Sequence, residues 1–167
     1  MKTAITTILL SFLMITGVNA QKYGHINSNA IIAAFPEVKT ADATLESYST
    51  QLIEKGQSMM KDYETSYQAY MTKANGGEIS QLQMQQEETK LGQKQQEIQQ
   101  YEVEVKDLVA KKKQEVYQPI LDKIQVAINE VGKENGYTMI FDAGSTGMVF
   151  ALETEDIMAL VKTKLGI

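Results

Sequence analysis

Apolar and aromatic residues between Pro36 and Lys73 recur at steps of three, four or seven positions, with polar residues between them. This spacing places the recurring residues on one face of an α-helix. The stripe is narrow, as in coiled coils, and differs from the broad face of a helix that covers a globular core. We therefore predict one long helix from about Thr40 to Ala74. The residues of the stripe are Leu45, Tyr48, Leu52, Met59, Tyr63, Tyr67 and Tyr70.

A second stripe of the same kind follows, and it includes Leu91, Ile98, Tyr101, Val105 and Leu108. Asn75-Gly76-Gly77 between the two stripes is a strong turn signal. Two long helices joined by a tight turn form an antiparallel hairpin. We expect this hairpin over residues 40–117, with its turn near 75–78. At 1.5 Å per residue each helix would be roughly 50 Å long, so the pair is expected to project as an arm.

The two ends of the chain predict a small α+β body from residues 21–39 and 118–167. Strands are expected at Tyr23–Asn27, at Tyr137–Phe141 and at Met148–Leu152, the last two forming a hairpin. A short helix is expected from Ser28 or Asn29 to Ala34, and a last helix capped by Thr154. Pro119 predicts a kink or a fresh helix start where the second long helix enters the body.

This body has only 69 residues, and the chain contains no cysteine. A single core of that size seldom contributes more than about 3–5 kcal/mol of stability. Three short strands also leave sheet edges that require a partner. We therefore expect an obligate oligomer in which strands from several copies close a common sheet.

Residues 1–20 have the organisation of a secretory signal peptide. Lys2 precedes a mostly apolar stretch, and Val18-Asn19-Ala20 offers small residues for cleavage between Ala20 and Gln21. The alternative is an uncleaved membrane anchor, although the apolar stretch is shorter than the ~20 residues that a span requires. The mature chain is expected to be exported and soluble.

The composition excludes several function classes. The chain has no Cys and a single His, His25, so cysteine metal sites, thiol nucleophiles and Ser-His-Asp chemistry lack their residues. We interpret His25 as structural and expect no enzyme activity, metal or cofactor. The loop from Asp142 to Gly147 lacks the spacing of a phosphate or calcium loop and reads as a turn. A formal net charge of −5 without any Arg argues against nucleic-acid binding.

Several segments in order resemble the Skp/OmpH family of periplasmic chaperones. The resemblance covers about Tyr23 to Ile167 and implies a homotrimer with a small β-barrel-like body and helical-hairpin arms around a cavity. It also implies an ATP-independent holdase for unfolded outer-membrane proteins in the periplasm. The matching segments are Tyr-Gly-His-Ile-Asn-Ser at 23–28, Ala-Ala-Phe-Pro-Glu at 33–37, Tyr-Gln-Pro-Ile-Leu-Asp-Lys-Ile at 117–124, Asn-Gly-Tyr at 135–137, Thr-Glu-Asp-Ile at 154–157 and Lys-Leu-Gly-Ile at 164–167.

The charge of the arm departs from the basic members of that family. Residues 40–113 contain 9 Lys against 12 acidic residues. This balance argues against a lipopolysaccharide or membrane contact and against electrostatic capture of clients. Lys111-Lys112-Lys113 is the one basic cluster, and we interpret it as a solvated turn of helix.

A holdase requires adaptable apolar groups, and the arm offers methionine and tyrosine. Tyr63, Tyr67 and Tyr101 fit the seam between the helices. Met60, Met71 and Met84 lie off the main stripes, so they are the first candidates for client contact. Met59, Tyr48 and Tyr70 are further candidates, with a purely structural role in the seam as the alternative.

Gly56 and Gly92 lie at comparable distances from the expected turn, and each weakens a helix by about 1 kcal/mol relative to Ala. One hypothesis is that they form a hinge in the arm. The alternative is that both are tolerated on a solvated face. A second function class also stays open: a structural or adaptor protein of the cell envelope that uses the hairpin as a spacer or assembly clamp.

Overall fold

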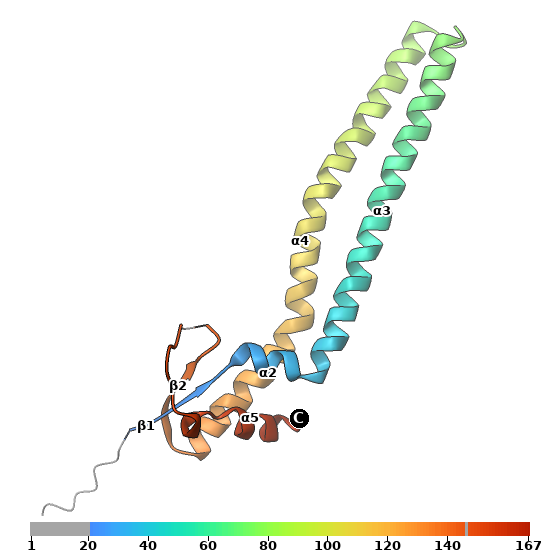
Figure 1. Ribbon diagram of the computed structural model, residues 1–167. Helices are drawn as coiled ribbons and strands as arrows, with labels where there is room; N and C mark the ends of the chain where they lie inside the picture. The colour runs from blue at the N-terminus through green and yellow to red at the C-terminus, as the bar shows by residue number, and fades with distance from the viewer. Residues whose placement is uncertain (1–20, 146) are drawn as a thin grey trace, which may run out of the picture. The chain divides into compact units, whose positions relative to one another are not determined.

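The computed structural model describes residues 21–145 and 147–167. The signal-peptide prediction for residues 1–20 therefore lies outside the described residues. The elements in chain order are β1 (Lys22–Ile26), α2 (Ser28–Ala34), α3 (Pro36–Asn75), α4 (Gln81–Glu134), β2 (Tyr137–Asp142), a 3-10 turn η1 (Glu153–Glu155) and α5 (Met158–Leu165) (Figure 1). The chain divides into two compact units. The strand unit combines residues up to Asn29 with Ala127–Gly166, and the helix-pair unit is Ala30–Val126.

The prediction of two long helices is confirmed, and α3 and α4 have 40 and 54 residues. Helix α3 begins at Pro36, where the preceding Phe35 is extended and proline suits the first helical turn. Its end is closed by a hydrogen bond of 3.0 Å from the Gly76 N–H to the Thr72 carbonyl. Gly77 follows in the left-handed region with φ of 66°, a conformation that glycine adopts without a steric penalty.

Helix α4 runs through Pro119, so the expected fresh helix start at this residue is wrong. Proline cannot donate a hydrogen bond to the carbonyl of Glu115, four residues earlier. Both residues lie on the exposed side of α4, where water can hydrogen-bond to that carbonyl. Packing directly after the proline helps to keep the helix continuous, since Ile120 and Ile124 are buried.

The strand unit contains a two-stranded sheet in which β1 and β2 run parallel. His25 pairs with Phe141 of β2, and on its other edge it forms a bridge to Asp156. The expected hairpin between Tyr137–Phe141 and Met148–Leu152 is therefore wrong, and residues 148–152 form no strand. The chain beyond this segment instead reaches β1, where Asp156 forms the bridge to His25 and the Ile157 N–H donates to the His25 carbonyl at 3.0 Å.

The core of the strand unit forms where β1, α4 and α5 supply apolar residues. Ile26, Val131, Ile157 and Val161 are all buried. Gly24 in β1 is also buried. Tyr137 and Ile157 lie so close to it that a side chain at this position would meet both.

Helix α5 begins at Met158, and the Asp156 carboxylate accepts from the Met158 N–H at 2.7 Å. This corrects the expectation that Thr154 caps the last helix, because Thr154 lies in η1 and the chain extends again at Asp156. Lys164 holds the other end of α5 to α4 through ion pairs with Glu130 and Glu134, at 3.1 and 2.7 Å. None of the helices in the described ranges combines the length and the apolar character needed to cross a bilayer.

Candidate functional site

Side-chain hydrogen bonds join α3 to α4 along the helix-pair unit. From one bond to the next, the residue number of the α3 partner increases while that of the α4 partner decreases. The two helices therefore run side by side in opposite directions (Figure 1). The pairs are Glu37 with Lys123 at 2.6 Å, Asp42 with Tyr117, the Leu52 carbonyl with Tyr101 at 3.0 Å, Ser66 with Lys94 at 2.8 Å and Glu88 with Tyr70 at 2.6 Å.

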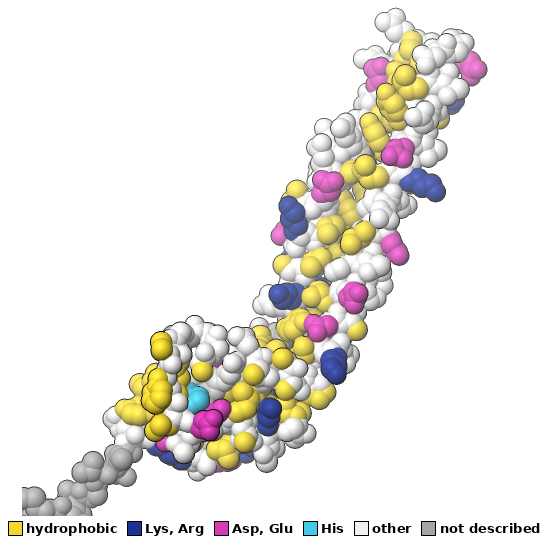
Figure 2. Space-filling view, in the orientation of Figure 1, with side chains coloured by type: hydrophobic (Ala, Val, Ile, Leu, Met, Phe, Trp, Pro, Cys, Tyr) yellow, Lys and Arg dark blue, Asp and Glu magenta, His cyan; other side chains and the backbone are white. Residues whose placement is uncertain are grey.

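Few of the residues between these polar contacts are fully buried. Leu52 and Leu91 are at most 9% exposed, and Tyr101 is 6% exposed, as its predicted seam position requires. Most other apolar residues of the pair are half-buried or exposed. Figure 2 accordingly shows a band of hydrophobic side chains along the pair, flanked by charged side chains of both signs. Two helices alone cannot cover this band, which leaves it accessible to a binding partner.

The structure distributes the predicted client-contact residues along this band. Met60 is 46% exposed, whereas Met59, Met71, Met84 and Tyr48 are half-buried. Tyr70 is also half-buried, and its hydroxyl donates to the Glu88 carboxylate at 2.6 Å. This hydrogen bond raises the pKa of Tyr70 above its ordinary value of 10.0, because it is made by the neutral phenol to a negative acceptor.

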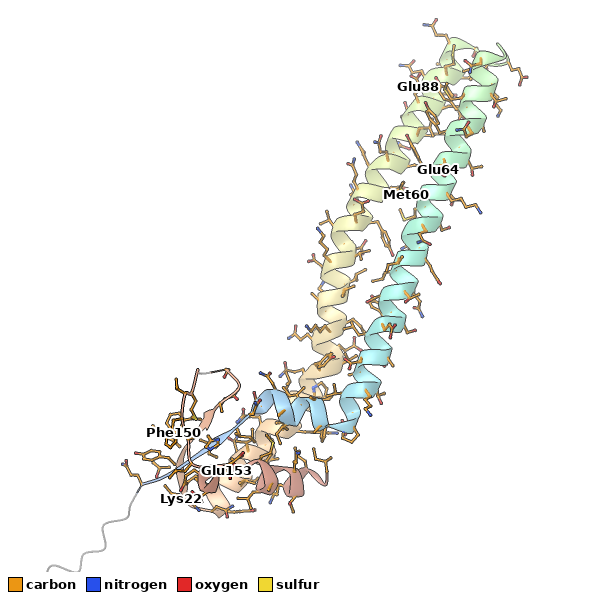
Figure 3. All side chains as sticks on the ribbon, viewed as in Figure 1. Lys22, Met60, Glu64, Glu88, Phe150 and Glu153 are labelled. Atoms are coloured by element: carbon orange, nitrogen blue, oxygen red, sulfur yellow. The ribbon has the colours of Figure 1, made fainter. Side chains whose placement is uncertain are left out.

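A hollow of about 550 Å³ opens beside Gly56 in the seam. Its lining contains Gly56 and two of the predicted client-contact residues, Met59 and Met60. Figure 3 shows Met60 and Glu64 on successive turns of α3. The residues that sequence reasoning did not assign to a site are Gln57, Lys61, Glu64, Ile98, Tyr101 and Glu102. The sequence feature that could have indicated this hollow is Gly56, which occupies a position of the apolar repeat where a larger side chain is expected.

A second hollow of about 440 Å³ contains Tyr48 and Lys112. The Lys112 ammonium lies 5.8 Å from the centre of the Tyr48 ring and 2.9 Å from a Glu115 oxygen. The central lysine of the basic cluster at 111–113 is therefore paired with a carboxylate.

The two glycines of the hinge hypothesis have different surroundings. A Cβ on Gly56 would lie 3.5 Å from Cε1 of Tyr101, an ordinary contact distance. A Cβ on Gly92 would meet nothing within 4 Å. Alanine therefore fits at both positions without rearrangement.

The strand unit carries a separate exposed apolar surface, which Figure 2 shows over β2 and the segment after it. Val149 is 99% exposed, and Phe150, which is labelled in Figure 3, is 81% exposed. Tyr23, Met139, Phe141 and Leu152 are also exposed, and the Tyr23 and Phe141 rings lie 6.3 Å apart. We call these six residues the apolar sheet surface.

Polar chemistry in the strand unit serves the fold. His25 Nε2 lies 3.1 Å from the Leu152 carbonyl, in agreement with a structural role. Asp142 accepts hydrogen bonds from the backbone and side chain of Ser28 and from Gly144 and Ser145, which lower the pKa of its carboxyl from 3.8 to about 2. Within the described ranges, no three His, Cys, Asp or Glu residues gather as metal ligands would.

The fold and these surfaces define a class: a mainly helical protein with an exposed Met- and Tyr-containing band along two long helices. A family model described as outer membrane protein (OmpH-like) matches residues 22–165, and the chain belongs to this family. Its fold is similar to the crystal structure of a Caulobacter crescentus protein described as an OmpH-like outer membrane chaperone. The TM-score is 0.74 at 17% identity, over 89% of this chain and 86% of that chain. None of the curated proteins matches this chain.

Proposed function

We propose that this protein is an ATP-independent periplasmic holdase that keeps unfolded outer-membrane proteins soluble. The family membership supports a chaperone role. The observation that carries the proposal is the exposed apolar band along α3 and α4, with hollows at Met60 and at Tyr48. Thioether and phenol side chains adapt to many partners, which a chaperone of many sequences requires.

The direct test is aggregation of a denatured β-barrel outer-membrane protein on dilution from urea. We expect near-stoichiometric amounts of the mature chain to suppress light scattering without ATP.

The second candidate function is a spacer or assembly clamp, which the polar cross-links between α3 and α4 favour because they make the pair a defined rod. A spacer would leave client aggregation unchanged, and that result would contradict the holdase proposal.

We propose Met60, Met71 and Met84 as client contacts, with Met59, Tyr48 and Tyr70 in support. Replacing the first three by Gln preserves helix propensity and side-chain length while removing apolar surface. The triple variant is expected to suppress aggregation less well at unchanged helical circular dichroism. Met158→Gln makes the same type of change in the strand unit and serves as the control. Full activity of the triple variant would contradict the assignment.

Gly56 and Gly92 are proposed as a hinge that lets the helix pair adjust to clients of different size. Because alanine fits at both positions, the double Gly→Ala variant tests flexibility without a steric clash. We expect smaller differences in small-angle scattering between free and client-bound protein. Unchanged adjustment in this variant would contradict the hinge and favour tolerated glycines.

The working form is proposed to be a homotrimer whose strand units form a barrel-like body, with the client held in a cavity between the helix pairs. A two-stranded sheet is marginal by itself, and exposure of Val149 and Phe150 is unfavourable in water. Covering the apolar sheet surface with other copies would remove both problems. The acidic helix pair argues against a lipopolysaccharide or membrane contact.

A further inference from the structure

The hollow beside Gly56 exists because one side chain is missing from the apolar repeat of α3. Leu52 lies four residues before Gly56 and Met59 three residues after it, which is the spacing of neighbouring seam positions. Across the seam, the ring of Tyr101 lies 3.5 Å from where a Cβ of Gly56 would be. The resulting volume of about 550 Å³ falls in the range of sites that bind small organic groups, roughly 300–1,000 Å³.

The inner wall of this hollow combines a fixed aromatic ring with adaptable thioethers. Tyr101 is fixed because it is buried and its hydroxyl donates to the Leu52 carbonyl at 3.0 Å. Met59 and Met60 lie beside it, and Met60 is 46% exposed at the opening. Methionine sulfur makes favourable contacts with the edges of aromatic rings, and a ring packs well against another ring.

The rim adds charges that complement an aromatic ring without selecting a charged ligand. Lys61 contributes an ammonium group, while Glu64 and Glu102 contribute carboxylates. Ammonium groups favour the negative face of a ring and carboxylates its positive edge. The Lys55 ammonium already lies 4.6 Å from the centre of the Tyr101 ring, so this part of the surface uses such contacts.

We propose that this hollow is a receptor for single aromatic side chains of unfolded outer-membrane polypeptides. The inference rests on the holdase function proposed above and names the chemistry of the group that is bound. Strands of outer-membrane barrels carry girdles of aromatic residues, so such clients present many copies of this ligand. Binding one side chain at a time, through a site open to solvent, gives the weak and reversible contact that a holdase requires.

The test uses the mature full-length protein and one host peptide with Phe, Leu or Ala at a single guest position. Dissociation constants are measured by fluorescence anisotropy of a dye at the peptide end. An aromatic contact beyond simple apolar burial is expected to make the Phe peptide bind about two- to ten-fold tighter than the Leu peptide. Equal binding of the Phe and Leu peptides would overturn the aromatic assignment.

Two variants and one control locate the binding site. Gly56→Leu fills the hollow and is expected to remove the preference for Phe over Leu. Ala110→Leu adds apolar surface at an exposed position of α4 outside the lining of the hollow, and is expected to keep that preference. Met60→Gln, at an exposed position, is expected to weaken Phe binding even if the Gly56 variant perturbs the seam. An undiminished Phe preference in both Gly56→Leu and Met60→Gln would overturn the site.

The aggregation assay separates failure of this inference from failure of the holdase function. If the parent chain suppresses client aggregation and no variant changes peptide preference, the aromatic receptor is wrong and the holdase proposal stands. If the parent chain binds the Phe peptide selectively but suppresses no aggregation, the holdase proposal is wrong and the receptor stands as a site for aromatic side chains.

Discussion

Gly24 lies where β1 passes between two large side chains. A Cβ at this position would lie 2.9 Å from Cε1 of Tyr137 and 3.0 Å from Cγ2 of Ile157. Overpacking of this kind typically destabilises a protein by about 1–3 kcal/mol. Gly24→Ala is therefore expected to lower the urea midpoint, measured by circular dichroism at one protein concentration. Gly92→Ala, which meets nothing, is expected to raise the midpoint slightly, and equal effects of the two variants would contradict this account.

Asp142 makes the stability of the strand unit depend on acid pH. Hydrogen bonds, chiefly from the Ser28 hydroxyl, hold the pKa of its carboxyl near 2 in the folded chain, below the ordinary 3.8. The stabilisation is thus complete above pH 3.8 and disappears as the pH falls through about 2. Asp142→Asn and Ser28→Ala are expected to flatten the loss of unfolding free energy over this interval. A pH dependence identical to that of the parent would contradict the assignment.

At the scale of elements, the sequence predicted α3 and α4 because a helical repeat depends only on local spacing. It did not predict that β1 and β2 run parallel, because Lys22 and Tyr137 are far apart in the chain and pairing leaves no local pattern. Met148–Leu152 has the apolar character of a strand, yet its partner cannot be deduced from its composition.

Only part of the candidate site could be predicted from the sequence. Met59 and Met60 could be proposed from chemistry, since thioethers suit variable partners. The hollow itself could not be predicted, because it depends on which residue of α4 faces Gly56. That residue is Tyr101, and the register between two helices is set by contacts along their whole length.

Pro119 is the weakest local position of α4. It removes one hydrogen bond from a helix interior, and an internal proline costs about 3 kcal/mol relative to Ala. Pro119→Ala is expected to raise the thermal midpoint, because the residue is exposed and Ala restores the N–H donor. Differential scanning calorimetry measures the change. An unchanged or lower midpoint would show that the helix at 119 relies on the proline's rigidity.

At the scale of the whole molecule, self-association is expected to depend on the apolar sheet surface. Changing Val149 and Phe150 to Asp would place charges at the centre of any contact made there, which opposes burial. The double variant is expected to have the mass of a single chain by light scattering, and the parent is expected to have three times that mass. Ile53→Asp changes an equally apolar residue of α3, 57% exposed, and serves as the control. An unchanged mass in the double variant would contradict this role.

The parallel pairing of β1 with β2 also has a consequence for the order of folding. Lys22 and Tyr137 are joined by a loop that contains both long helices, and closing such a loop from a random coil costs on the order of 4 kcal/mol of chain entropy. Helices α3 and α4 form from nearby residues, and the contact between Glu37 and Lys123 shortens the remaining loop. We therefore expect the sheet to close late, after the helices have paired. The proposed client-contact surface would then be complete before the proposed contacts between copies can form.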